Sequence, residues 1–135
     1  MALIFEETNF EKVKEFMTIF GQEVASTPDW PDRETVDLRL ELIQEEVAEL
    51  IAGVAQKDFV NTAKELTDIL YVVYGMGAAL GVDLDATFAE VHRSNLSKLE
   101  NGKVLYRKDG KVMKGKDYSP ANIGQVLAAY TIGHP

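Results

Sequence analysis

Apolar residues recur at intervals of three and four along most of the chain, a spacing typical of amphipathic helices. The pattern predicts four long helices, over about residues 9–24, 32–54, 58–80 and 83–101. Two prolines within residues 28–31 separate the first helix from the second, and Gly81 ends the third. The short link between the second and third helices predicts an antiparallel hairpin. The expected fold class is therefore all-α, a four-helix bundle.

The region after the fourth predicted helix has a different pattern. Lys and Arg outnumber Asp and Glu in this tail, about residues 102–130, and Asp109-Gly110 lies in it between two short alternating apolar runs. Such a dipeptide predicts a hairpin or a tight loop. Ser119-Pro120 is then expected to cap a short last helix over about residues 121–130.

Composition narrows the chemistry that the chain can perform. Its 135 residues are typical of one domain, so we expect a single domain over residues 1–135 with a helical core over 9–101. The chain has no Cys and two separated His, which excludes disulfides and thiolate zinc sites and leaves little for a histidine metal site. The 14 Lys and Arg against 22 Asp and Glu give a formal charge of −8. This charge disfavours nucleic acid and favours cations.

Targeting signals are not evident in the sequence. The N-terminal stretch carries Glu6 and Glu7 where a signal peptide would carry a basic lead, and no apolar run approaches the roughly 18 residues of a membrane span. We therefore expect a cytoplasmic protein without a membrane partner.

Acidic residues cluster on the second and third predicted helices, and they are Glu45, Glu46, Glu49, Glu65 and Asp68. A helix turns by roughly 100° per residue, which places Glu65 within about 40° of Val72 and Met76. Glu65 is therefore expected to point inward, whereas the three acids of the second helix border its buried face. The competing interpretation is a solvated acidic surface, which stays open for Glu45 because adjacent Glu residues are common on exposed helices.

An inward carboxylate needs a positive partner, because an ionised and unpaired one costs several kcal/mol. Bases are scarce on these helices: Lys64 is expected on the outer side, and Arg39 is the one base on the inner half of the second helix. Several carboxylates without His or Cys are the ligand set of a hard cation, so the pattern predicts Mg²⁺ or Mn²⁺.

The basic tail fits beside such a site. Protein-bound Mg²⁺ usually bridges carboxylates to substrate phosphates, and nearby cations would complete a phosphate clamp. The candidates are Arg93, Asn95, Lys98, Arg107, Lys111, Lys114 and Lys116. A solvated lysine-rich loop is the competing interpretation. Trp30, Phe16 and Tyr118 could stack a base, but ordinary packing is the more common role of such residues.

These residues carry a family resemblance. Glu45-Glu46-x-x-Glu49, Glu65-x-x-Asp68 and the run that continues to Lys98 resemble the all-α nucleoside triphosphate pyrophosphohydrolases. This MazG-like group includes dimeric dUTPases and phosphoribosyl-ATP pyrophosphohydrolases. The resemblance covers roughly residues 36–123.

The resemblance implies a Mg²⁺-dependent enzyme that cleaves a nucleoside triphosphate between the α and β phosphates to give a monophosphate and pyrophosphate, in a house-cleaning or dUTPase-like role. By position, Glu46, Glu49, Glu65 and Asp68 would be metal ligands, and Glu45 would orient or deprotonate the attacking water. Substrate would be bound by Asn95, Lys98, Lys111, Lys114 and Tyr118. Members of the group assemble as homodimers or dimers of dimers.

Two alternatives stay open. One is a phosphoribosyl-ATP pyrophosphohydrolase of histidine biosynthesis, which has the same architecture and a different substrate. The other is a non-catalytic helical scaffold whose acidic helices bind a basic partner. Binding of Mg²⁺ separates the scaffold from the enzymes, because a ligand of the folded state raises its stability by mass action.

Overall fold

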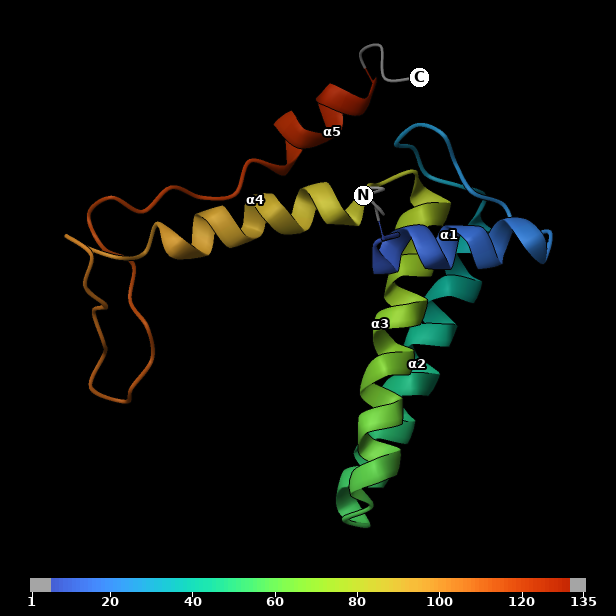
Figure 1. The fold of residues 1–135 in the computed structure, drawn as a ribbon, viewed down its shortest axis with the longest axis horizontal. Coiled ribbons are helices and arrows are strands. Elements are labelled where there is room, and N and C mark those ends of the chain that lie inside the picture. The colour runs from blue at the N-terminus through green and yellow to red at the C-terminus, as the bar shows by residue number, and fades with distance from the viewer. Residues whose placement is uncertain (1–5, 132–135) are drawn as a thin grey trace, which may run out of the picture. The chain divides into compact units, whose positions relative to one another are not determined.

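The computed structural model describes residues 6–131, and their regular structure is helical (Figure 1). The helices are α1 (Asn9–Ile19), α2 (Arg33–Ala55), α3 (Phe59–Leu80), α4 (Leu84–Leu96) and α5 (Ile123–Thr131). Within this range β-structure amounts to isolated bridges in the tail. The prediction of an all-α fold is confirmed.

The chain divides into two compact units, residues 1–84 and 85–135, which are described one at a time. The first unit contains α1, α2 and α3, and the second contains α4 after its first residue, the basic tail and α5. The predicted single domain over 1–135 stays a prediction.

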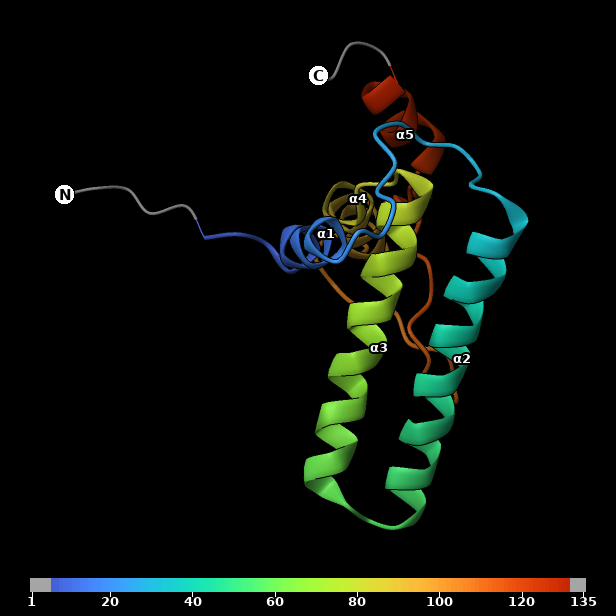
Figure 2. The ribbon, with the colours of Figure 1, turned by 90° about the vertical axis from the view of Figure 1, so that its right-hand side faces the viewer.

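The hairpin of α2 and α3 dominates the first unit, and Figure 2 shows the two helices side by side and antiparallel. Aspartate caps start both helices: Asp32 Oδ1 accepts the Thr35 N–H at 2.8 Å, and Asp58 Oδ1 accepts the Asn61 N–H at 3.1 Å. These caps satisfy amides that have no partner within the helix. Both helices begin and end within about one residue of the predicted limits, and the hairpin is confirmed.

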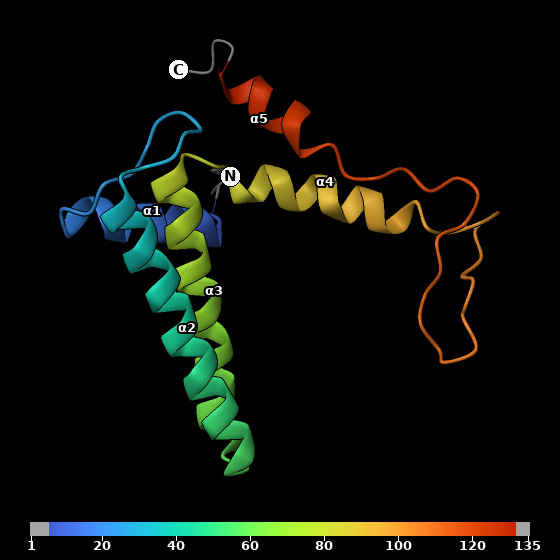
Figure 3. The same ribbon diagram turned by 180° about the vertical axis from the view of Figure 1, so that it is seen from behind.

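Helix α1 supplies most of the apolar core of the first unit. Thr8 and Glu11 form a capping box at its start, and α1 then lies across the C-terminal half of α3 (Figure 3). Phe10, Val13 and Met17 are buried in a cluster that includes Ala78 of α3. The core therefore lies where α1 meets α3, away from the link between α2 and α3.

The predicted end of the first helix is wrong. We expected it near Val24, but α1 ends at Ile19, and Gly21 follows with φ of 73°. Glycine adopts this left-handed conformation without a Cβ clash, so it stops the helix. Val24 still packs against the core from outside a helix, which is why its apolar character suggested a longer one.

The segment after α1 closes the C-terminal end of α3. The Ala25 N–H donates to the Ala78 carbonyl and the Asp29 N–H to the Leu80 carbonyl, both at 3.0 Å. These bonds satisfy carbonyls that a helix end leaves free. Gly81 has φ of 71°, and a Cβ there would lie 2.1 Å from the Thr27 carbonyl oxygen. The close approach therefore requires glycine.

In the second unit, two predicted limits are wrong. Helix α4 ends at Leu96 instead of about 101, because Ser97 to Leu99 form turns and Gly102 has φ of 74°. Helix α5 begins at Ile123, and Asn122 Oδ1 caps it by accepting the Gln125 N–H at 3.1 Å.

The expected cap, Ser119-Pro120, has another role. The Ser119 carbonyl accepts the Ser94 hydroxyl at 2.8 Å, and the Ser119 N–H donates to Ser97 Oγ at 2.8 Å. These bonds fasten the end of the tail to α4. Between α4 and this point the chain forms the predicted hairpin, with a bridge between Tyr106 and Val112 and a turn at Gly110, whose φ is 87°.

Candidate metal and phosphate sites

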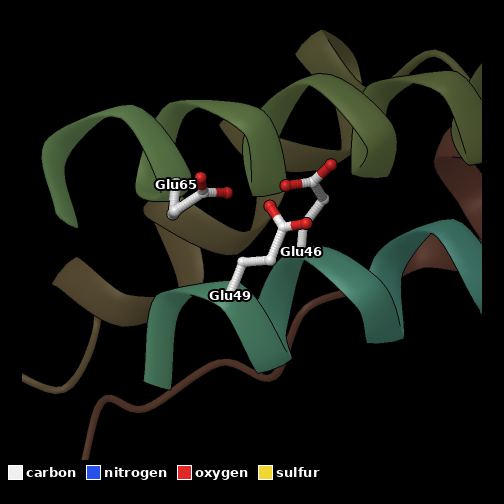
Figure 4. Close-up of side chains that lie close together, drawn as sticks. All are labelled: Glu46, Glu49 and Glu65. Carbon is white, nitrogen blue, oxygen red and sulfur yellow. The ribbon is translucent and has the colours of Figure 1, made fainter. Parts of the chain in front are cut away.

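Three of the predicted metal ligands meet between α2 and α3. Glu46 and Glu49 come from α2 and Glu65 comes from α3, and one carboxylate oxygen of each lies within 4.8 Å of the others (Figure 4). The antiparallel hairpin brings them together, since it places the C-terminal half of α2 beside the N-terminal half of α3. In the first unit, Glu46, Glu49 and Glu65 therefore converge as predicted.

Burial makes this cluster costly without a cation. Glu65 is 4% exposed, which confirms that it points inward. Glu65 Oε2 and Glu46 Oε2 are both buried, and neither has a hydrogen-bond partner. A buried carboxylate oxygen without a partner loses its hydration and gains nothing in return. The donor set therefore fits a hard divalent cation, which takes oxygen ligands.

The carboxyl groups also perturb one another. The hydrogen bond that a protonated Glu46 carboxyl can share with Glu65, burial, and the charges of Glu49, Asp68 and Glu65 raise the pKa of Glu46 to about 7. Glu65 likewise raises the pKa of Glu49, first through a hydrogen bond and then through its charge. Crowded like charges favour protonation, and a bound cation would reverse this effect.

Lys64 lies closer to the acids than the sequence indicated. Its Nζ is 2.7 Å from Asp68 Oδ2 and 3.6 Å from Glu65 Oε1. Lys64 is exposed, as predicted for the outer side of the helix, but its long side chain reaches both carboxylates. Asp68 is thus paired with Lys64 and is not part of the three-carboxylate cluster. One ammonium does not neutralise four carboxylates.

Glu45 is exposed on α2, beside the cluster in sequence but not part of it. Its catalytic assignment stays a prediction.

Arg39 is a buried cation. The sequence predicted its place on the inner half of α2 but not the residues that it contacts. Arg39 is 8% exposed, and one of its terminal nitrogens donates to Gln22 Oε1 at 3.1 Å. Its Nε is buried without a partner, and burial lowers the pKa of this guanidinium. Gly75 makes room for it, since a Cβ there would lie 2.8 Å from Arg39. No pattern in the sequence indicated Gln22 as its partner.

The aromatic candidates in the first unit have different surroundings. Phe16 stacks on Phe20, with ring centroids 4.3 Å apart, and meets the edge of Tyr71, so it is a packing residue. Trp30 is 75% exposed and, with Asp29 and Thr35, lines a cavity of about 320 Å³.

The predicted substrate-binding residues lie in the second unit. Asn95 and Lys98 lie at and just beyond the C-terminal end of α4 and line one pocket. Lys114 Nζ lies 4.7 Å from the centre of the Tyr118 ring, a cation–π contact. Lys111 is exposed, and its backbone N–H donates to Asp109.

Two other bases of the proposed clamp already have carboxylate partners. Arg93 makes two hydrogen bonds to Glu90, at 2.7 and 2.9 Å, and these together with the Asn122 N–H lower the pKa of Glu90 to about 2. Arg107 pairs with Asp109 in the turn of the hairpin. Both bases therefore stabilise the tail itself, which leaves the lysines as the better phosphate candidates.

Tyr106 was not among the sequence candidates. It lines the same pocket as Asn95 and Lys98, and the residue is 65% exposed. The alternation of Val104 and Tyr106 before the turn could have indicated that Tyr106 lies in this pocket, because alternate residues of a strand-like segment share a face.

The all-α fold is consistent with the MazG-like nucleotide pyrophosphohydrolases, and the family match assigns the chain to this superfamily. Residues 13–95 match the family described as phosphoribosyl-ATP pyrophosphohydrolase, and the chain belongs to this family. The matched range contains Glu46, Glu49 and Glu65.

A relative in Acanthamoeba polyphaga mimivirus, described as an uncharacterized protein, is 37% identical over 97 residues. The match covers 69% of this chain and 36% of that relative, so the chain spans little more than a third of its length.

Among the helices of residues 6–131, none is by itself long and apolar enough to cross a membrane, although α3 and α4 pass that test as a bent pair by length and composition alone.

Proposed function

We propose that this chain is a divalent-metal-dependent nucleotide pyrophosphohydrolase that cleaves nucleoside triphosphates between the α and β phosphates. The observation that carries the proposal is the meeting of Glu46, Glu49 and Glu65 with two buried oxygens that lack partners. The family to which the chain belongs supports the same reaction class. A house-cleaning or dUTPase-like role, in the cytoplasm, is part of the proposal.

Glu46, Glu49 and Glu65 would hold the cation, and Asp68 would join them if its ion pair with Lys64 opened. Mg²⁺ is the expected ion, with Mn²⁺ as a substitute, because both prefer oxygen ligands. The bound ion would supply positive charge to the phosphate oxygens and lower the pKa of water.

The chain's own residues would position the reactants. Glu45 would take a proton from the attacking water, whose oxygen forms a bond to the α phosphorus. The bond from that phosphorus to the bridging oxygen breaks at the same time, and pyrophosphate leaves with its electron pair. The products are a nucleoside monophosphate and pyrophosphate.

The formal charges of the two units have opposite signs, which supports different binding roles for them. The first unit has 6 Lys and Arg against 17 Asp and Glu, a formal charge of −11, and the second has 8 against 5, a formal charge of +3. The acidic unit suits cations and the basic unit suits phosphates. Lys98, Lys111, Lys114 and Tyr118 would contact the phosphates, and Asn95 would contact the sugar.

A second copy of the chain is the proposed partner of the α2–α3 hairpin. Both helices carry an exposed apolar stripe, Leu40, Val47, Ile51 and Val54 on α2 and Phe59, Leu66, Leu70 and Val73 on α3. The spacing of three, four and seven keeps each stripe on one face. Such a surface favours a homodimer or a dimer of dimers.

The deciding experiment is a panel of ribo- and deoxynucleoside triphosphates and phosphoribosyl-ATP, assayed with Mg²⁺ for released pyrophosphate and orthophosphate. We expect pyrophosphate, and orthophosphate as sole phosphate product would overturn the cleavage position. Preference for phosphoribosyl-ATP would select the histidine-biosynthesis alternative.

Glu49→Gln should abolish turnover, because it removes a proposed ligand without changing side-chain volume. Glu41→Gln is the matched control, since Glu41 is an exposed acid of α2 outside the cluster. Equal activity of the two variants would remove Glu49 from the ligand set, whereas an inactive wild-type protein whose thermal stability does not respond to Mg²⁺ would support the non-catalytic scaffold.

A further inference from the structure

The pocket beside the C-terminal end of α4 has the composition of a nucleoside site. It has a volume of about 200 Å³ and is lined by four aliphatic side chains, two of them Val104 and Val112, together with Asn95, Lys98 and Tyr106. Its wall is thus largely apolar, with one aromatic ring, one amide and one ammonium. Ligand sites of this kind combine apolar walls with a few polar groups that fix orientation.

The fold of the tail builds this pocket. The bridge between Tyr106 and Val112 and the hydrogen bond from the Met113 N–H to the Leu105 carbonyl, at 2.8 Å, set the register of the hairpin. This register places Val104, Tyr106 and Val112 in the pocket wall.

The return segment of the hairpin is also fastened to α4. The Gly115 N–H donates to the Lys98 carbonyl at 3.0 Å, and a Cβ at Gly115 would lie 2.8 Å from that oxygen. Backbone contacts therefore hold the hairpin against the helix end, and the pocket is a fixed part of the second unit.

We propose that this pocket receives the nucleoside part of the substrate, with the base stacked on the Tyr106 ring. The inference rests on the proposed function, which supplies a nucleotide as the ligand. Aromatic rings stack on bases whatever their identity, because every base has a π face. The Asn95 amide both donates and accepts hydrogen bonds, which suits a base edge or a sugar hydroxyl. The Lys98 ammonium suits the adjoining phosphate.

The test is calorimetric titration of the full-length protein with the four deoxynucleoside monophosphates and with ribose 5-phosphate, in EDTA. Tyr106→Ala should weaken monophosphate binding by about ten- to a hundredfold, the range of one lost base–aromatic stack. It should leave the weaker ribose 5-phosphate binding unchanged, and Tyr106→Phe should retain wild-type binding. Lys98→Ala should weaken binding of both ligands.

Met113→Ala is the matched control, because Met113 is an exposed apolar residue of the same hairpin and does not line the pocket. Equal effects of Tyr106→Ala and Met113→Ala, or no monophosphate binding by the wild-type protein, would overturn the inference.

The hydrolysis panel distinguishes this failure from failure of the proposed function. Release of pyrophosphate with a KM that Tyr106→Ala does not change would overturn the pocket and keep the enzyme. Tyr106-dependent nucleotide binding without any hydrolysis would support the pocket and overturn the enzyme.

Discussion

At the scale of single residues, buried acidic side chains in the first unit are the strongest indication of a ligand site. Glu65 lies in the N-terminal half of α3, where a helical surface without a ligand site would be apolar or solvated, and it is buried beside Glu46. The α2–α3 hairpin therefore holds negative charge where a stable hairpin needs apolar contacts. Because these acids do not stabilise the hairpin, their placement supports the proposal that they bind a cation.

Replacing Glu65 by Gln should raise the melting temperature in EDTA by about 3 °C, because an amide keeps the volume and removes a buried charge among like charges. Addition of Mg²⁺ should raise the melting temperature of the wild-type protein and not that of the variant. Differential scanning fluorimetry measures both effects, with Glu41→Gln as the control. A melting temperature lowered by 10 °C or more would indicate a structural role for Glu65.

Stability without metal should fall as pH rises from about 5 to 8. The pKa of Glu46 is about 7 in the fold against its ordinary value of 4.5, so between these values the folded state binds more protons than the unfolded state. Stability then decreases with pH through this window. Glu90, whose pKa is lowered to about 2, is ionised throughout it and adds no slope.

Urea unfolding in EDTA at pH 5 and pH 8 measures this effect, and Glu46→Gln should reduce the difference between the two. An unchanged difference in the variant would assign the slope to other groups.

At the scale of elements, the helix limits that sequence analysis predicted correctly are those marked by a capping residue or a chain break. Asp32 and Asp58 begin the two long helices as predicted, because a cap is a local interaction between neighbouring residues. The predicted ends of α1 and α4 are wrong, because the apolar residues Val24, which packs against the core, and Leu99, which lines a pocket, both lie outside a helix. Periodicity records burial, and it does not distinguish a helix from a turn that packs equally well.

The same distinction holds for the candidate site. The inward direction of Glu65 follows from helix geometry alone, and its burial confirms it. The contacts of Lys64 and Arg39 depend on the rotamers of long side chains and on Gln22 of another segment. The angular position of a residue on its helix determines neither the rotamer of a long side chain nor the position of another segment, so these contacts could not be predicted.

Gly81→Ala should lower the free energy of unfolding by about 3 kcal/mol or more. It forces a Cβ into the left-handed region and into the Thr27 carbonyl, 2.1 Å away. Gly21→Ala is the matched control: Gly21 has nearly the same φ, 73°, and nothing lies within 4 Å of its Cβ position. That control should cost only about 1 kcal/mol. Equal losses in urea denaturation would show that the contact with Thr27 contributes nothing.

At the scale of the whole molecule, apolar surface exceeds what the first unit can bury by itself. Its buried apolar cluster lies at the crossing of α1 and α3, whereas the stripes on α2 and α3 are exposed, with Leu70 at 55%. Acidic and basic side chains are also divided between the two units. Both features support the proposals that a second copy of the chain and an anionic substrate are its partners.

Leu70→Glu should convert an oligomer into a monomer, because it places a charge in the apolar stripe that a second copy would cover. Sedimentation equilibrium measures the mass directly. Ala52→Glu adds the same charge at an exposed position of α2 outside the stripes and should keep the oligomer. A monomeric wild-type protein at micromolar concentration would contradict the prediction.

The segment that closes the C-terminal end of α3 also carries Trp30, the single tryptophan of the chain. Its intrinsic fluorescence therefore reports the surroundings of this segment alone, without any attached label. If the segment detaches from α3 before the helices melt, emission will change at a lower denaturant concentration than the far-ultraviolet circular dichroism. The order of these two signals would show whether this segment or the α2–α3 hairpin opens first.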